Sequence, residues 1–406
     1  MLQHLERTYI ALFREYPELL RLGVVAGAGQ IAFALVNVYA LPMYLIEDLH
    51  VSGVALGATS ATFLVCEMAL KFPMGRLSDR LGRKPFIVLG PLLICLSPTL
   101  VARLPLRLWA LVFPLRVADG VGAAALWPPL FAMIGDLVRP RSRAAAMSAV
   151  NTVYVAAIGV AAALGALVAH AAHSNRFPFY VASGLLLVAA VVGYWGLPRS
   201  RPAAVPTAAT PAEAAPAPAP YPMFLVLLIS LLMTMGALTL ASFALPYLKF
   251  EFGLSGLGVG GLLAALGVPV LLLGLPLGHA ADRWGRTLAV RLSLGASAAL
   301  MWLVPSCHSL VAFSAVAVLL VLSQILGIPA WLAVVSELAP TNRRGGVMGM
   351  VATAEGAGAA LGPVLGGLLW DRQHADVFYG AAAILTLAAL VAALALRREP
   401  APTVGC

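Results

Sequence analysis

Long apolar runs separated by short charged loops dominate this sequence. Each run is close to the ~20 residues that a helix needs to cross a bilayer, whereas a strand of a membrane barrel would show ~10 residues of alternating polarity. The pattern therefore predicts an all-α membrane protein of twelve transmembrane helices, at residues 22–46, 54–75, 85–102, 106–133, 145–170, 177–197, 223–249, 256–277, 287–306, 309–333, 345–369 and 377–396.

A stretch rich in proline and alanine divides the runs into six and six. It has almost no large apolar side chain, so it cannot build a core and is expected to be an extended linker. The expected order is an amphipathic cytoplasmic segment, a six-helix bundle, the linker, a second six-helix bundle and a cytoplasmic tail, at residues 1–21, 22–197, 198–222, 223–396 and 397–406.

The basic residues predict the orientation in the membrane. With the N-terminus in the cytoplasm, the cytoplasmic segments hold 19 of the 26 Lys and Arg residues, and the outer loops hold five. Because basic residues gather on the cytoplasmic side of membrane proteins, both termini and the linker are expected there, in a multi-pass protein of the cell (inner) membrane.

Composition argues against several classes of function. Charged residues make up 11% of the chain, against about 25% in soluble domains. The net charge of +9 lies in loops between apolar runs, which indicates topology rather than nucleic-acid binding. The four cysteines lack metal-ligand spacing, and the sequence holds no phosphate-binding Gly-x-x-x-x-Gly-Lys-Ser/Thr motif. We therefore expect no enzyme, metal, cofactor or nucleic-acid partner.

The two groups of six runs repeat each other in sequence. The second run leads into Gly75-Arg-Leu-Ser-Asp79-Arg80-Leu-Gly82-Arg83. The eighth leads into Gly278-His-Ala-Ala-Asp282-Arg283-Trp-Gly285-Arg286, which lies 203 residues further on. Six-helix repeats are an architecture of transporters.

These two loops resemble the signature of the major facilitator superfamily, and the resemblance extends to the span count, the linker and the repeat. It implies that the loop residues form a conformational latch between the two halves: Gly75, Asp79, Arg80, Gly82, Arg83, Gly278, Asp282, Arg283, Gly285 and Arg286. Gly75 is expected to let helices approach closely, Gly82 to permit a tight turn, and Asp79 to form an ion pair. The alternative is that the basic residues only set the topology.

Two opposite charges fall within the fourth run. Arg116 and Asp119 are three residues apart, so they share a helix face and can partly neutralise each other. A charge in mid-span costs roughly 2.5–3.5 kcal/mol. The segment resembles the superfamily's span-4 motif, an arginine followed four residues later by glycine, here Gly120. Proton or substrate handling is one interpretation, and a purely structural pair is the other.

Three further charges lie in the second and eleventh runs. Glu67 and Lys71 are four residues apart in the favourable order, and Glu355 has no opposite charge nearby in sequence. The resemblance implies that these two spans pack together, which makes a Glu67–Lys71–Glu355 cluster plausible, either as a proton site or as a packing contact.

One motif of the proton-coupled drug antiporters in this superfamily, Gly-Pro-x-x-Gly-Gly in the fifth span, is missing. The sequence there is Ala161-Ala-Ala-Leu-Gly165-Ala, and the intact motif starts instead at Gly362 in the eleventh run. This departure leaves two directions of transport open.

The resemblance implies a central cavity lined by the first, fourth, seventh and tenth spans. Its candidate lining residues are Gln30, Asn37, Tyr39, Thr234, Ser242, Gln324 and Trp331. Each could instead be a helix-packing contact. A mostly apolar lining favours amphipathic substrates over sugars.

The function expected from these observations is a secondary active transporter that exports small amphipathic compounds in exchange for protons by alternating access. Its partners would be the lipid bilayer, a small-molecule substrate and protons; the proton gradient would supply the energy, and the chain would act as a monomer. The alternative is a proton-coupled importer of a small metabolite, with Arg116 binding a carboxylate.

Overall fold

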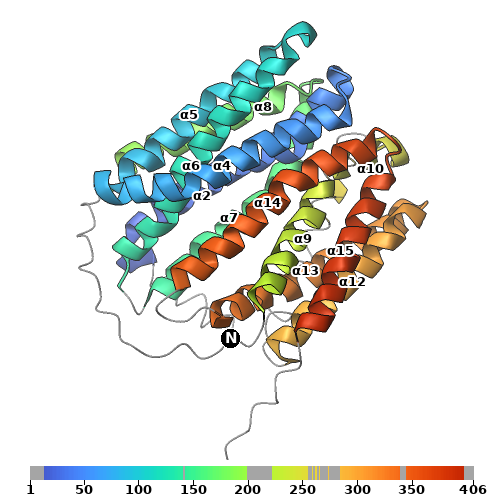
Figure 1. Ribbon diagram of the computed structural model, residues 1–406. Coiled ribbons are helices and arrows are strands. Elements are labelled where there is room, and N and C mark those ends of the chain that lie inside the picture. Colours follow the sequence, from blue (N-terminus) through green and yellow to red (C-terminus); the bar gives the residue numbers. More distant parts are fainter. Residues whose placement is uncertain are drawn as a thin grey trace, which may run out of the picture. The chain divides into compact units, whose positions relative to one another are not determined.

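A computed structural model describes residues 13–139, 142–198, 222–254, 258, 261, 262, 265, 273, 284–338 and 344–396. Every regular element among these residues is helical (Figure 1). The linker, the C-terminal tail and most of the eighth predicted run lie outside the described residues.

Ten helices of the described part of the chain are long and apolar enough to cross a membrane. They coincide with ten of the twelve predicted runs. The fifth run belongs to a 29-residue helix whose residues Gly159–Ala171 form a shorter apolar segment. The eighth run is outside the described residues, so the count of twelve and the cytoplasmic placement of the termini stay predictions.

The chain divides into two compact units by its internal contacts. Unit 1 comprises Met1–Val51, Thr62–Ala208 and Leu254–Gly261, and unit 2 comprises Ser52–Ala61, Ala209–Gly253 and Leu262–Cys406. The division falls near the predicted linker, with two exceptions: the first residues of the long helix α4 (Gly53–Leu81) group with unit 2, and Leu254–Gly261 groups with unit 1.

The first half of the chain forms seven α-helices with short π and 3-10 turns between some of them. They are α2 (Pro17–Ala34), the π-helical turn η1 (Leu35–Ala40), α3 (Leu41–Met43), the π-helical turn η2 (Tyr44–Asp48), α4 (Gly53–Leu81), α5 (Arg83–Arg103), the 3-10 turn η3 (Leu106–Leu111), α6 (Val112–Leu137), α7 (Arg143–Ala171) and α8 (Phe177–Gly196). Within unit 1, α2 packs on α7 and α8, and α5 packs on α6 and α8 (Figure 1). The resulting core includes Leu22, Ile87 and Leu130, all fully buried.

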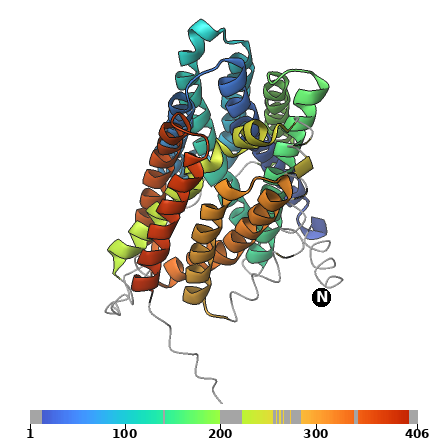
Figure 2. The same cartoon turned by 90° about the vertical axis from the view of Figure 1, so that its right-hand side faces the viewer.

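The second half forms the corresponding helices of unit 2. They are α9 (Met223–Ala241), α10 (Ala244–Phe252), α12 (Arg286–Leu303), the 3-10 turn η5 (Val304–Ser306), α13 (Leu310–Leu338), α14 (Arg344–Trp370) and α15 (Asp376–Ala395). Here α9 packs on α14 and α15, and α12 packs on α13 and α15 (Figure 2). These pairs are the unit 1 pairs shifted by six spans, so the repeat seen in the sequence is also present in the packing.

Matching glycines start the third helix of each group. Gly82 precedes α5 with φ 91° and ψ 150°, and Gly285 precedes α12 with φ 94° and ψ 137°. L-residues with a Cβ rarely adopt this region of backbone space. The structure thus confirms the tight turn expected at Gly82 and shows the same conformation 203 residues later.

Replacing Gly82 by alanine is expected to lower the free energy of unfolding by about 1–3 kcal/mol, because the new Cβ forces the residue into a strained region. Thermal unfolding in detergent would measure the loss. Gly184→Ala on α8 is the matched control, because a Cβ at Gly184 meets nothing within 4 Å. Equal stability of the Gly82 and Gly184 variants would contradict this account of the turn.

A close approach of two helices at Gly75 is not seen among the described residues, and the expectation stays a prediction. A Cβ added at Gly75 would lie 3.8 Å from Pro128 Cβ, an ordinary van der Waals distance. Close approach occurs instead along α14. A Cβ at Gly358, Gly362 or Gly366 would lie 2.4, 2.6 or 2.0 Å from the backbone carbonyl oxygens of Leu231, Met235 and Thr239 on α9.

Candidate functional site

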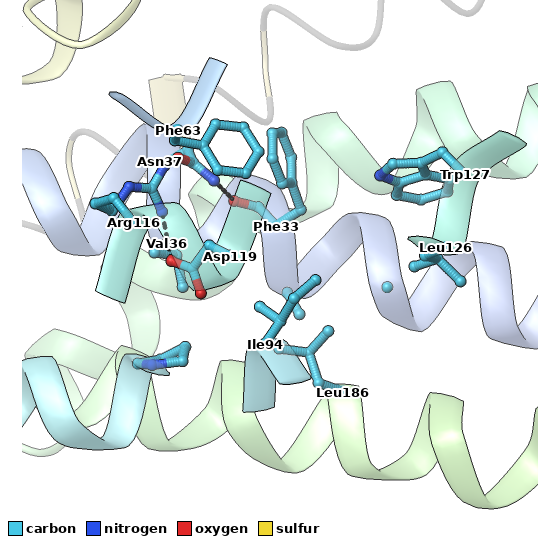
Figure 3. A pocket seen from close by; sticks show the side chains of 13 residues that line it. Phe33, Val36, Asn37, Phe63, Ile94, Arg116, Asp119, Leu126, Trp127 and Leu186 are labelled. Carbon is cyan, nitrogen blue, oxygen red and sulfur yellow. Dashed lines mark hydrogen bonds and ion pairs between the residues drawn. The ribbon is translucent and has the colours of Figure 1, made fainter. Parts of the chain in front are cut away.

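The two opposite charges predicted within a span form a buried ion pair inside unit 1. Arg116 and Asp119 lie on α6 and are 1% and 3% exposed. Arg116 Nη1 donates to Asp119 Oδ2 at 2.8 Å (Figure 3). Their spacing of three residues places them on one face of the helix, so the sequence alone accounts for the pairing.

A second polar group holds the guanidinium from η1, the π-helical turn that follows α2. Arg116 Nη2 donates to Asn37 Oδ1, and Asn37 Nδ2 donates to the carbonyl oxygen of Phe33 at 2.8 Å (Figure 3). The ring of Phe63 covers the guanidinium, with 4.4 Å between Arg116 Cζ and the ring centroid. A cation over an aromatic face in a desolvated place is stabilised by roughly 2 kcal/mol.

Glycines on α6 allow the neighbouring helices to come close enough to form this site. A Cβ at Gly120 would lie 2.9 Å from the carbonyl oxygen of Phe63 on α4, and one at Gly122 would lie 2.8 Å from that of Gly90 on α5. The glycine four residues after Arg116, noted as part of a motif, therefore has a physical role: it lets α4 bring Phe63 over the arginine.

The charged pair borders a small cavity within unit 1. Its volume is about 20 Å³, and a site of ≳ 10–15 Å³ can hold one water molecule. Most of its wall is apolar; the lining residues are Gly29, Ala32, Phe33, Val36, Asn37, Phe63, Ile94, Pro98, Arg116, Asp119, Leu126, Trp127 and Leu186 (Figure 3).

Two polar atoms of the pair have no hydrogen-bond partner among the described residues. They are Arg116 Nε and Asp119 Oδ1, both buried. The Ser97 hydroxyl lies near the carboxylate, while its own bond to the Leu115 carbonyl is long, at 3.5 Å. Buried polar groups are usually satisfied by protein or water, so a water in the cavity would complete the set. A carboxylate oxygen that faces such a water can accept a proton from it.

The other predicted intramembrane charges are only partly brought together. Glu67 and Lys71 form an ion pair on α4 with 2.9 Å between Oε1 and Nζ. Glu355 is half-buried on α14 in unit 2. The Glu67–Lys71–Glu355 cluster stays a prediction, and so does a proton-handling role for its members.

The loop after α4 forms a charge network within unit 1. Arg83 contacts Asp79 through Nη2 at 3.4 Å and Asp136, at the end of α6, through Nε at 2.5 Å. The expected ion pair of Asp79 is therefore with Arg83, four residues on; Arg80 is exposed.

In the repeated loop, Gly278, Asp282 and Arg283 lie outside the described residues, Gly285 precedes α12, and Arg286 is its first residue. The latch role of both loops stays a prediction.

The described contacts of the predicted cavity-lining residues lie within their own units, and the lining of a central cavity stays a prediction. In unit 1, Asn37 lines the cavity, whereas Gln30 is buried outside that lining and Tyr39 packs on Gly165 of α7. A Cβ at Gly165 would lie 2.7 Å from Tyr39 Cγ, which shows how tightly these two helices pack without the missing proline.

The predicted cavity residues of unit 2 contact other residues of the same unit. Ser242 Oγ is 3.1 Å from Ser60 Oγ, and Gln324 Nε2 donates to Ser297 Oγ at 2.9 Å. Trp331 is buried in the core of unit 2, and Thr234 lies against α14 at Gly358.

Sequence reasoning missed the aromatic walls of the cavity, formed by Phe33, Phe63 and Trp127. The signal available was weak, because aromatic residues in apolar runs are common as packing residues. The repeated glycines of α6 were the better indication that other helices approach the arginine.

Comparison with known proteins agrees with the fold and the repeat. The sequence profile of the Major Facilitator Superfamily matches residues 22–227 and again residues 226–405. The chain therefore belongs to this superfamily of membrane transporters and is not an enzyme.

Relatives in bacteria cover most of the chain. Multidrug resistance protein 1 of Bacillus subtilis (strain 168) is 27% identical over 352 residues, 84% of this chain and 87% of that protein. Multidrug resistance protein 2 of the same strain is 26% identical over 331 residues, which are 80% and 82% of the two chains.

Solved structures show the same fold at low identity. The crystal structure of a mutant of the nucleoside transporter NupG has a TM-score of 0.76 and 12% identity, covering 93% of this chain and 99% of that one. A bacterial homolog of the human lysosomal transporter Spinster has a TM-score of 0.75 and 16% identity, with 94% and 98% covered. At such identities the likeness concerns the fold.

Proposed function

We propose that this chain exports small amphipathic compounds in exchange for protons, by alternating access between its two six-helix halves. It works as a monomer in the inner membrane, with both termini in the cytoplasm, and uses the proton gradient rather than a bound cofactor. Asp119 takes up and releases the proton, and Arg116 keeps its charge balanced. The latch loop at Asp79 acts on the cytoplasmic side.

The observation that carries this proposal is the unpartnered oxygen of Asp119 beside a water-sized cavity in an apolar wall. Ionisable residues inside membrane spans are costly and usually functional. A purely structural ion pair would be expected to satisfy both carboxylate oxygens, whereas here Oδ1 has no hydrogen-bond partner among the described residues. The similarity to two multidrug resistance proteins supports an amphipathic substrate.

The importer alternative needs Arg116 to bind a substrate carboxylate. In unit 1 the guanidinium is 1% exposed and is already held by Asp119, Asn37 and the ring of Phe63. A substrate would have to displace these groups, so export is favoured.

Purified protein in liposomes with a pH-sensitive dye inside tests the proposal. A lipophilic cation, a neutral amphipathic compound and a small carboxylate would each be added to the bath. Because transport is reversible, an exchanger that lets substrate in releases protons and raises the internal pH, whichever way the protein is inserted. We expect this rise with the amphipathic compounds and its loss in Asp119→Asn.

Glu251→Gln is the control, since it removes an exposed carboxylate at the end of α10 and should behave as the unaltered protein. A fall in internal pH, which means that substrate and protons move together, would favour the importer. No pH change with any compound, with the helical fold intact, would rule out proton coupling for this panel.

A further inference from the structure

The amide of Asn37 is oriented by a contact on its own helix. Its Nδ2 donates to the carbonyl oxygen of Phe33, four residues earlier, at 2.8 Å. The amide nitrogen is thus directed toward the backbone, and Oδ1 is left to accept from Arg116 Nη2 (Figure 3). A leucine of similar size could make neither bond, and an aspartate would lose the donor.

The position of Asn37 in its helix is also unusual. It lies in η1, the π-helical turn at Leu35–Ala40 that follows the α-helical part of the first span. Single π turns inside helices are rare and occur frequently at functional sites. The contact to Arg116 therefore starts from the part of the span whose backbone departs from the α-helix.

The three groups around Arg116 determine which carboxylate oxygen stays open. Nη1 binds Asp119 Oδ2 and Nη2 binds Asn37 Oδ1, while the Phe63 ring covers the plane of the guanidinium. Nη2 carries two N–H groups, and its bond to Asn37 holds the guanidinium in the orientation in which Oδ2 of Asp119 accepts from Nη1. In this arrangement Oδ1 is buried and has no hydrogen-bond partner among the described residues, with the Ser97 hydroxyl near the carboxylate.

We infer that Asn37 is a positioning residue for proton exchange at Asp119. It holds the guanidinium on one carboxylate oxygen and so keeps the other open to the cavity. When Asp119 becomes neutral, Arg116 loses its charge attraction to that carboxylate but stays in contact with Asn37 and Phe63. The force that Arg116 exerts on Asn37 then changes, and Asn37 transmits the change to the π turn of the first span, in which it lies. This inference depends on the proposed proton exchange.

Few charged side chains lie near Asp119 among the described residues. Among the described residues that line the cavity, the charged ones are Arg116 and Asp119 themselves. On α4, which lies close to α6 at Gly120, Glu67 and Lys71 are paired with each other. On α2, α5 and α8 the described lining residues are uncharged. Glu67 nevertheless acts electrostatically on Arg116, so a change in pH dependence after substitution of Asn37 reports on the Arg116–Asp119 pair together with Glu67.

The test measures substrate-driven proton movement in liposomes between pH 5 and pH 9 for Asn37→Leu and for the unaltered protein. A hydrogen bond to a charged group is strong enough to move a titration midpoint by about one pH unit. We expect the pH midpoint of the rate to move by about that amount, with the KM for substrate unchanged. Thr99→Val is the control, because it removes a hydrogen bond to Ser183 between α5 and α8 of the same unit and should leave the midpoint unchanged.

The outcomes separate this inference from the proposed function. If the unaltered protein moves no protons, the proposed function fails and the inference fails with it. If it does, and Asn37→Leu keeps the same midpoint, Asn37 has no positioning role. Should Asn37→Leu not fold, Asn37→Asp retains the acceptor for Arg116 and places a second carboxylate on it. An unchanged midpoint in that variant would also overturn the inference.

Discussion

Replacing Arg116 by methionine is expected to lower the free energy of unfolding by about 3–5 kcal/mol, the cost of leaving one member of a buried ion pair alone. The remaining Asp119 is 3% exposed and would lose its partner at 2.8 Å. Asn37 Oδ1 would at the same time lose the hydrogen bond that it accepts from Arg116 Nη2. Thermal unfolding in detergent, followed by circular dichroism, measures the loss.

The double replacement Arg116→Met with Asp119→Leu separates stability from function. Exchanging both members of a buried pair for apolar residues of similar volume is often neutral or stabilising. We therefore expect the double variant to unfold near the temperature of the unaltered protein while moving no protons in liposomes.

Arg176→Met is the control for the single replacement. Arg176 is exposed beyond the end of α7, 5.5 Å from the centroid of the Tyr44 ring, and exposed contacts of this kind are worth about 0.5–1 kcal/mol. A double variant that stays folded and still exchanges substrate for protons would show that the pair serves only the fold.

The transmembrane helices could be predicted because their signal is local. A bilayer-spanning helix needs about 20 apolar residues in succession, and each run supplies this without reference to the rest of the chain. The pair of Arg116 and Asp119 could be predicted equally well from the sequence, since a spacing of three residues on one helix fixes their separation.

The contact between Arg116 and Asn37 could not be predicted in the same way. The two residues are 79 positions apart, and whether they meet depends on how the first span, which contains η1, and α6 are rotated about their axes. In a bilayer that rotation is set by packing of small residues rather than by an apolar face. The sequence has glycine and alanine on many faces of α6, so it does not say which face meets which helix.

The same reason explains why the sequence could not show which helix lies next to Gly75. A glycine at the end of a span next to a loop has the composition of a close-packing position, but among the described residues only the Cβ of Pro128 lies within 4 Å of a Cβ added there. The Gly-Pro-x-x-Gly-Gly element of α14 was recognised as a motif, yet its register on α9 follows only from the structure. There the glycines at intervals of four match carbonyl oxygens at intervals of four.

Replacing Gly366 by alanine is expected to lower the free energy of unfolding by about 3 kcal/mol, the upper part of the range for overpacked cores. The added Cβ would lie 2.0 Å from the carbonyl oxygen of Thr239 and 3.0 Å from Phe243 Cε2. A backbone carbonyl on α9 cannot turn aside as a side chain can, so α14 must move away from α9 along its length. The loss would be measured as a lower unfolding temperature in detergent.

Gly349→Ala on the same helix is a control whose effect on the free energy of unfolding should have the opposite sign. A Cβ at Gly349 meets nothing within 4 Å, and alanine favours the helix over glycine by up to about 1 kcal/mol. That variant should be as stable as the unaltered protein or slightly more so. If both alanines change stability equally, helix propensity and not contact with α9 governs α14. Opposite signs would mean that the glycines at intervals of four fix how closely the two helices pack.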